Sequence, residues 1–199
     1  MANYDYDMVV IGAGAAGLTV AAGASQLGAK TALIEKRPQL GGDCLLYGCV
    51  PSKTLIKTAK VYHYAKNLQR FGLPAVDVPT CDLHSVMNHV KGIINKVAVH
   101  DSVERFQGMG VDVIFGSARF VSEHEITVGD KTLSSARFTI ATGSSPTVFP
   151  IEGLKETGFL TNEEIFSAKV LPQRFVVLGS GPIGAELAHA FTRLGSKTT

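Results

Sequence analysis

Short apolar runs alternate with helical patterns along this chain. MVVI (residues 8–11) and KTALIE (residues 30–35) are bounded by turn residues, as buried strands of a parallel sheet are. Between them lies an Ala/Leu-rich segment that ends at a Leu-Gly pair, which is typical of a helix closed by a C-terminal glycine. Strand, helix and strand in this order predict a βαβ unit.

The middle of the chain changes from helical to β-type patterns. Helical spacing continues through residues 54–71 up to Gly72, and one apolar stripe predicts a second long helix over residues 82–107. From Val111 onward, three short β-type runs with turns between them predict further strands. After a proline-containing connection, TNEEIF (residues 161–166) predicts a short helix.

The first strand-helix pattern returns near the end of the chain. Residues 8–31 and 175–198 align without a gap at an offset of 167 residues, and each contains G-x-G-x-x-G. The first glycine permits a tight turn, the second lets a pyrophosphate approach the backbone, and the third lets the helix pack close to the sheet. The glycines are Gly12, Gly14 and Gly17 in the first copy, and Gly179, Gly181 and Gly184 in the second.

The first copy also has an acid where nucleotide-binding units use one. Glu35 lies 18 residues after Gly17, at the end of the next apolar run. An acid at this position holds the ribose hydroxyls of an adenine nucleotide. The equivalent position in the second copy would be 202, beyond Thr199. We therefore expect the N-terminal part of a longer protein, ending inside a second dinucleotide-binding domain before its second strand.

Composition and charge exclude several classes of protein. A net charge of +2 gives no reason to expect a nucleic-acid or membrane partner, and three cysteines are too few for a secreted disulfide scaffold. Asp5 and Asp7 precede the apolar N-terminal stretch, where a signal peptide carries positive charge. We expect a cytoplasmic protein. The six histidines lack the spacing of zinc ligands, so no metal site is predicted, and Cys81 lies in a polar loop without a partner motif.

The other two cysteines lie five positions apart in the stretch GGDCLLYGCVPSK. An ideal helix holds residues at this spacing about 8.6 Å apart, whereas a disulfide needs less than about 7 Å. Cys44 and Cys49 therefore bridge only if the backbone departs from a regular helix, and Gly48 supplies that freedom. A helix start and Lys53 favour the reactive thiolate. The pattern favours a reversible redox couple, with two unrelated thiols as the alternative.

This stretch resembles the active-site signature GGxCxxxGCxPSK of the class I pyridine nucleotide–disulfide oxidoreductases. The order of features is similar too, since an Ala-Thr-Gly segment (residues 141–143) precedes the second glycine motif. The resemblance implies an α/β protein with a three-layer, Rossmann-like FAD-binding domain over residues 1–150, built from a parallel sheet and a β-meander. A connection over residues 151–171 and the beginning of a Rossmann-like NAD(P)-binding domain over residues 172–199 would follow.

The resemblance also implies which residues bind the cofactors. NAD or NADP would bind at the second glycine motif, and Asp43 stands where the family usually has threonine. FAD would be held by Gly12, Gly14, Ala16, Gly17, Glu35, Lys36, Gly42, Asp43, Lys53, Ala118, Thr142 and Gly143.

The family's catalytic roles map onto four residues of this chain. Cys49 would lie against the flavin, Cys44 would attack the substrate, and Lys53 would pair with Glu186. Electrons would pass from NAD(P)H through the flavin to the Cys44–Cys49 disulfide, and on to a small-molecule or protein-bound disulfide or dithiol substrate, in a homodimer.

Ser52 makes the chain more similar to dihydrolipoamide dehydrogenase and mercuric reductase than to glutathione reductase. We expect a dihydrolipoamide dehydrogenase-like activity, with mercuric-ion reduction as the alternative. An alternative of another class is a non-catalytic flavin-binding or redox-sensing fragment. The family's His–Glu base comes from a C-terminal domain of the partner subunit, so the 199 residues alone are expected to be inactive.

Overall fold

The computed structural model describes residues 4–199, which form two compact units. Unit 1 contains the chain up to Leu46 and from Lys96 to Ser145, and unit 2 contains Tyr47–Asn95 and Pro146–Thr199. The two units are defined by contacts within each part of the chain. The domain boundaries predicted near residues 150 and 172 stay predictions.

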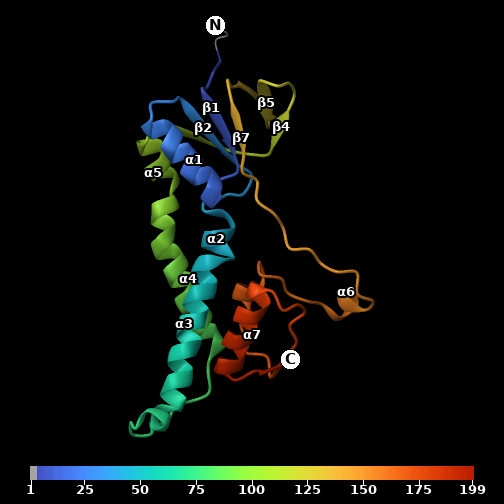
Figure 1. Ribbon diagram of the computed structural model, residues 1–199. Helices are drawn as coiled ribbons and strands as arrows, with labels where there is room; N and C mark the ends of the chain where they lie inside the picture. Colours follow the sequence, from blue (N-terminus) through green and yellow to red (C-terminus); the bar gives the residue numbers. More distant parts are fainter. Residues whose placement is uncertain (1–3) are drawn as a thin grey trace. The chain divides into compact units, whose positions relative to one another are not determined.

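Unit 1 is built on a parallel sheet with the strand order β3-β2-β1-β7 (Figure 1). A separate antiparallel meander has the order β4-β5-β6. The strands are β1 (Met8–Ile11), β2 (Thr31–Glu35), β3 (Val111–Phe115), β4 (Ala118–Phe120), β5 (Glu125–Val128), β6 (Lys131–Ser134) and β7 (Phe138–Ile140). The helices are α1 (Ala15–Gln26), α2 (Gly42–Leu46) and α5 (Val103–Gly108), with the 3-10 turn η2 (Val99–Asp101).

The central strands are apolar on both faces because the sheet is covered on both sides. Val10 and Leu33 pack with residues of α1 and α5, whereas their neighbours Val9, Ala32 and Ile34 pack with the meander. Successive side chains of a strand point to opposite faces, so uninterrupted apolar runs are what this position requires. The predicted three-layer arrangement of parallel sheet, helices and β-meander is confirmed.

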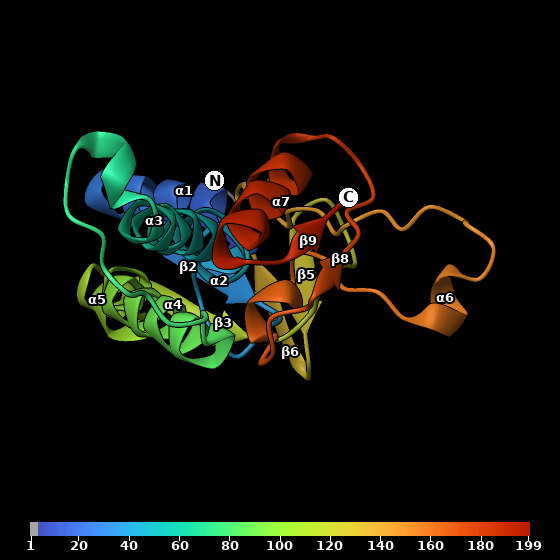
Figure 2. The same ribbon diagram turned by 90° about the horizontal axis from the view of Figure 1, so that it is seen from below.

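Unit 2 is held together by three helices that share one apolar cluster (Figure 2). Leu55 and Ala59 of α3, Met87 and Val90 of α4 and Phe191 of α7 are buried in it. The helices are α3 (Cys49–Lys66), α4 (Leu83–Ala98, whose end belongs to unit 1), α6 (Leu154–Thr157) and α7 (Pro182–Leu194), with the 3-10 turns η1 (Leu68–Phe71) and η3 (Ile165–Ser167).

The long helix predicted over residues 82–107 is broken, so that prediction is wrong in its extent. The helix α4 ends at Ala98, and α5 starts after Ser102. The Ser102 hydroxyl accepts a hydrogen bond from the Arg105 amide, which caps a new helix. The short helix predicted at TNEEIF is the 3-10 turn η3.

The second repeat forms a βαβ unit, contrary to the expectation that its second strand would be missing. The strand β8 (Arg174–Phe175) pairs in parallel with β9 (Lys197–Thr198), and α7 connects them. The Thr199 amide donates to the Phe175 carbonyl, and Val177 donates to the Thr199 carbonyl. Within the described residues, no helix has the length and the apolar run needed to cross a bilayer.

Candidate functional site

The first glycine-rich turn joins β1 to α1 in unit 1. Gly12 has a φ of 103°, in the region that favours glycine, and Gly14 is the N-cap of α1. A Cβ atom at Gly17 would lie 1.7 Å from the Gly12 carbonyl oxygen. The absence of this atom lets α1 start directly against the turn. Its first amides therefore face the carboxyl end of the sheet, where α/β proteins bind anions.

The Ala-Thr-Gly segment lies alongside this turn. The Ala141 amide donates to the Ile11 carbonyl, and a Cβ atom at Gly12 would lie 2.3 Å from the Ala141 oxygen. Thr142 and Gly143 follow as exposed residues. Segments about 130 residues apart in the sequence are thus joined because β1 and β7 are neighbours in the sheet.

Glu35, at the end of β2, is hydrogen-bonded to the same turn. Its side chain is only 8% exposed, and its Oε2 accepts a 2.7 Å hydrogen bond from the Ala13 amide. Its Oε1 accepts a 2.8 Å bond from the Arg37 amide. Each carboxylate oxygen has a further lone pair to offer, so Glu35 can hold the turn and still accept from a ligand hydroxyl.

The glycine pair before Cys44 also touches the first turn. The Gly41 amide donates to the Ala13 carbonyl, and a Cβ atom at Gly42 would lie 2.5 Å from the Gly14 Cα. Asp43 follows as an exposed residue in the first turn of α2. The α2 segment thereby starts in contact with the glycine-rich turn, which brings Cys44 to this site.

The remaining cofactor residues predicted for unit 1 surround the turn less closely. Ala16 is exposed in the first turn of α1, Lys36 is exposed after β2, and Ala118 is half-buried on β4. Sequence reasoning missed the structural roles of Ala13 and Gly41. Their backbone groups form the hydrogen bonds that connect the segments around the turn. The Gly-Gly doublet was the available signal, since both of its residues have positive φ.

The second glycine-rich turn repeats this geometry in unit 2. Gly179 has a φ of 110°, Gly181 is the N-cap of α7, and a Cβ atom at Gly184 would lie 2.5 Å from the Gly179 oxygen. Gly12 and Gly179 both occupy strand-to-helix turns, as the repeat predicted. Pro182 begins α7, where its missing N–H costs no hydrogen bond.

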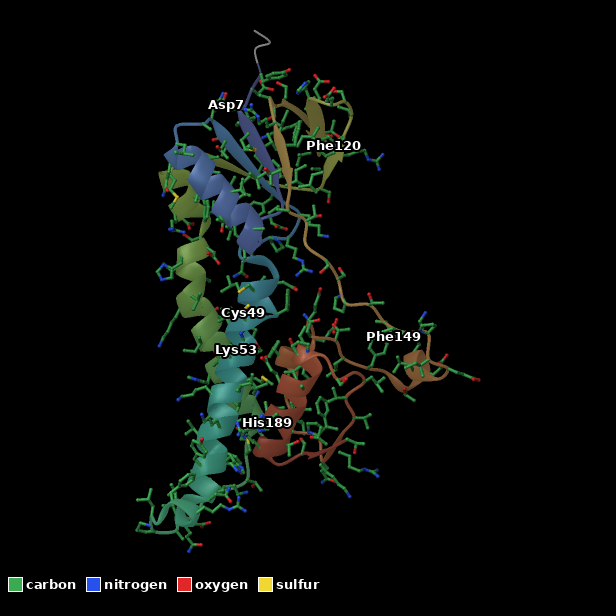
Figure 3. All side chains as sticks on the ribbon, viewed as in Figure 1. Asp7, Cys49, Lys53, Phe120, Phe149 and His189 are labelled. Carbon is green, nitrogen blue, oxygen red and sulfur yellow. The ribbon has the colours of Figure 1, made fainter. Side chains whose placement is uncertain are left out.

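Cys49 and Lys53 lie one turn apart at the start of α3 (Figure 3). Cys49 is exposed. The Lys53 Nζ donates to both carboxylate oxygens of Glu186 on α7, at 2.7 Å and 2.5 Å. The expected pairing of Lys53 with Glu186 is therefore present, and it ties the cysteine-bearing helix to the helix of the second glycine-rich turn.

The other cysteines differ in their surroundings. Cys44 is half-buried on α2 in unit 1. Cys81 packs against the apolar cluster of unit 2, which corrects the picture of a residue in a purely polar loop. Burial raises the pKa of the Cys81 thiol, and the neighbouring Asp82 raises it further. No group of histidine, cysteine and acidic residues suited to a metal ion occurs in the described part of the chain.

These features can be set beside known proteins. Residues 6–199 match the family described as pyridine nucleotide-disulphide oxidoreductase. The chain belongs to this family. The resemblance seen in the cysteine motif is thus confirmed, and the family consists of enzymes.

Two curated relatives and one solved structure illustrate the similarity. A mercuric reductase of Bacillus cereus is 38% identical over 197 residues, which cover 99% of this chain and 31% of the relative. A dihydrolipoyl dehydrogenase of Acholeplasma laidlawii is 35% identical, covering 98% of this chain and 59% of the relative. The HOCl-induced flavoprotein disulfide reductase RclA of Escherichia coli has a TM-score of 0.82 at 29% identity, covering 97% and 41% of the two chains. The chain thus spans less than two thirds of each.

Proposed function

We propose that this chain belongs to an FAD-dependent enzyme that passes electrons from NAD(P)H to a disulfide or dithiol substrate through a Cys44–Cys49 couple. The observation that carries this proposal is the convergence of three other segments on the first glycine-rich turn. These are Glu35, the Gly41–Gly42 pair and the segment that begins at Ala141.

The residues gathered there fit the ADP part of FAD. Gly14 and Gly42 pack so closely that no Cβ atom fits at Gly42, which leaves bare backbone at the α1 N-terminus for a pyrophosphate. Glu35 supplies acceptor oxygens for ribose hydroxyls. When bound, FAD supplies the chemistry that couples two-electron hydride donors to thiol–disulfide exchange.

The second glycine-rich turn is the proposed site of the pyridine nucleotide. Its support is the repeated geometry, in which a Cβ atom at Gly184 would lie 2.5 Å from the Gly179 oxygen, as one at Gly17 would lie 1.7 Å from the Gly12 oxygen. By equivalence with Glu35, the residue that would distinguish NAD from NADP is at position 202.

The residues on α3 are proposed to control the cysteine couple. Cys49 lies in the first turn of an 18-residue helix, one turn before Lys53. Lys53 adds a cation on the same face, and Glu186 holds its ammonium group in place. Glu186 is therefore proposed as a positioning residue, and Cys44 as the thiol that exchanges with the substrate.

We propose a dihydrolipoyl dehydrogenase-like substrate, a small or protein-bound dithiol, acted on by a homodimer. Mercuric-ion reduction is a second candidate, and the mercuric reductase of Bacillus cereus, at 38% identity, favours it. Ser52 is compatible with both.

Binding of FAD to the chain tests the nucleotide site. Gly14→Ala is the informative variant, because its Cβ atom would meet nothing closer than the Gly42 Cα at 3.8 Å, and Gly14 is the N-cap of α1, where the pyrophosphate is proposed to bind. We expect normal folding and at least tenfold weaker FAD binding, measured by quenching of flavin fluorescence, which corresponds to about 1.4 kcal/mol.

Gly181→Ala is the matched control, since it makes the same change in the second turn where nothing lies within 4 Å. It should leave FAD binding unchanged. Equal weakening by both variants would contradict the assignment of FAD to the first turn.

Peptide mapping under non-reducing conditions tests the cysteine couple. In the oxidised protein we expect Cys44 linked to Cys49, with Cys81 outside the bridge because it is packed against an apolar cluster. A bridge that includes Cys81 would exclude the proposed couple.

A further inference from the structure

Two acidic residues, Glu35 and Asp43, belong to segments that meet the first glycine-rich turn, and their surroundings differ. The Glu35 carboxylate is buried and accepts hydrogen bonds from the backbone amides of Ala13 and Arg37. Asp43 is exposed, and within residues 4–199 no hydrogen bond or ion pair engages its carboxylate. Glu35 is therefore a structural part of the turn, whereas the protein does not compensate the charge of Asp43.

The backbone places Asp43 close to the start of α1. A Cβ atom at Gly42 would lie 2.5 Å from the Gly14 Cα, so the two glycines are in contact. Adjacent Cα atoms are about 3.8 Å apart, which puts the Asp43 Cα within about 8 Å of the Gly14 Cα. Gly14 is the N-cap of α1, where the FAD pyrophosphate is proposed to bind. A carboxylate and a pyrophosphate would therefore share this end of the helix.

This placement sets like charges against each other. The repulsion of two unit charges about 7 Å apart corresponds to about a 3- to 50-fold change in an equilibrium constant, for effective dielectric constants between about 80 and 20. Because Asp43 is exposed to solvent, the lower part of this range applies. The backbone amides at the start of α1 still attract the phosphates, so the carboxylate weakens binding and does not prevent it.

We propose that the Asp43 carboxylate lowers the affinity of the first glycine-rich turn for FAD, so that the flavin is a dissociable cofactor. The fraction of the protein that carries flavin then follows the concentration of free FAD. Asp43 is thus a residue that sets cofactor affinity, and its charge opposes the pyrophosphate that the rest of the turn attracts. This inference rests on the proposed function, since it takes FAD as the ligand of this turn.

Three variants of the chain separate charge from shape. Asp43→Asn removes the charge and keeps nearly the same shape, whereas Asp43→Glu keeps the charge. Asp130→Asn is the matched control, because it removes the same charge from an exposed residue of unit 1, in the turn between β5 and β6. Quenching of flavin fluorescence measures the FAD dissociation constant of each variant, and circular dichroism verifies that each is folded.

We expect Asp43→Asn to bind FAD about 3- to 50-fold more tightly than the parent chain at low salt. The gain should shrink as salt rises from about 0.05 M to about 0.5 M, because the Debye length falls from about 14 Å to about 4 Å. Asp43→Glu and Asp130→Asn should both bind FAD as the parent chain does.

Two smaller ligands that compete with FAD locate the repulsion. ADP carries phosphates and adenosine does not. Asp43→Asn should therefore improve competition by ADP and leave competition by adenosine unchanged. An equal gain for adenosine would show that the side chain acts on the nucleoside, which would overturn the proposal.

Other outcomes would also overturn it, and each has a distinct meaning. Equal affinities of Asp43→Asn and the parent chain would remove the effect of the charge and leave FAD at this turn. Weaker binding by Asp43→Asn would show that the carboxylate holds the cofactor, through a bridging divalent cation if EDTA weakens the parent chain in the same way. An equal gain in Asp130→Asn would attribute the effect to net charge. Failure of the parent chain and of every variant to bind FAD would contradict the proposed function itself.

Discussion

The contact between Gly17 and the first glycine-rich turn predicts the effect of a single methyl group. In Gly17→Ala, the new Cβ atom would lie 1.7 Å from the Gly12 oxygen and 3.3 Å from a Val10 methyl. Side-chain Cβ atoms do not approach other atoms closer than about 3.0–3.4 Å. The helix α1 must therefore retreat from β1 by about 1.5 Å, and its buried residues Leu18 and Ala21 lose packing with it.

Two opposing terms set the magnitude. Alanine is favoured over glycine inside a helix by about 0.5–1 kcal/mol, whereas forcing an atom into a packed site costs about 1–3 kcal/mol or more. Subtracting the first term from the second, Gly17→Ala should lower the free energy of unfolding by about 0.5–2 kcal/mol. Gly23→Ala, in the same helix with nothing within 4 Å, should raise it by about 0.5–1 kcal/mol.

Urea unfolding of the two variants and the parent chain measures this difference. The chain has no tryptophan, so circular dichroism in the far ultraviolet is the suitable probe. We expect the midpoint to fall for Gly17→Ala and to rise slightly for Gly23→Ala, with similar slopes. A Gly17→Ala protein that unfolds at the same urea concentration as Gly23→Ala, or a higher one, would refute the role given to the third glycine.

Three further predictions concern side chains away from the glycine-rich turns. Burial raises the pKa of the Cys81 thiol, so iodoacetamide at neutral pH should label Cys49 well before Cys81, and equal labelling in a peptide map would contradict its burial. Burial and a hydrogen bond to Asp112 raise the pKa of Tyr6 from 10.0 to about 12, so stability should fall as pH rises from about 10 to 12, and Tyr6→Phe should remove that fall in alkaline unfolding curves. Ser102→Ala removes the N-cap of α5 and should lower the free energy of unfolding, measured by urea unfolding, by about 0.5–2 kcal/mol, whereas Ser102→Asp keeps a capping oxygen and should retain the stability of the parent chain.

The glycine-rich turns were determined by the sequence because their constraints are local. Gly12 and Gly179 need a positive φ, and Gly17 and Gly184 need the absence of a Cβ atom against a carbonyl five residues earlier. Such requirements are written as residue types at fixed spacing, so the repeat could be recognised and placed without coordinates. The alternation of strands and helices is local in the same sense, because it follows from the period of the apolar residues.

The helix break at Ser102 and the second strand β9 show where sequence patterns stopped being decisive. A continuous apolar stripe predicts one helix, but α4 ends at Ala98, and the Ser102 side chain accepts from the backbone to start a separate helix, α5. The two residues of β9 have no period to detect, and they form a strand only because β8 offers partners more than 20 residues away. Short elements of this kind depend on their neighbours more than on their own residues.

Tertiary packing alone decided which residues of α3 face the solvent and which side chains meet. Lys53 and Glu186 are 133 residues apart, and Cys81 lies in a segment whose polarity suggests a loop on the surface. The cluster shared by α3, α4 and α7 sets the rotation of α3, and this rotation leaves Cys49, Lys57 and Lys60 together on the outside. The sequence shows the charges, but only the burial of the opposite face determines that they share one surface, because burying apolar side chains outweighs any preference of an exposed lysine.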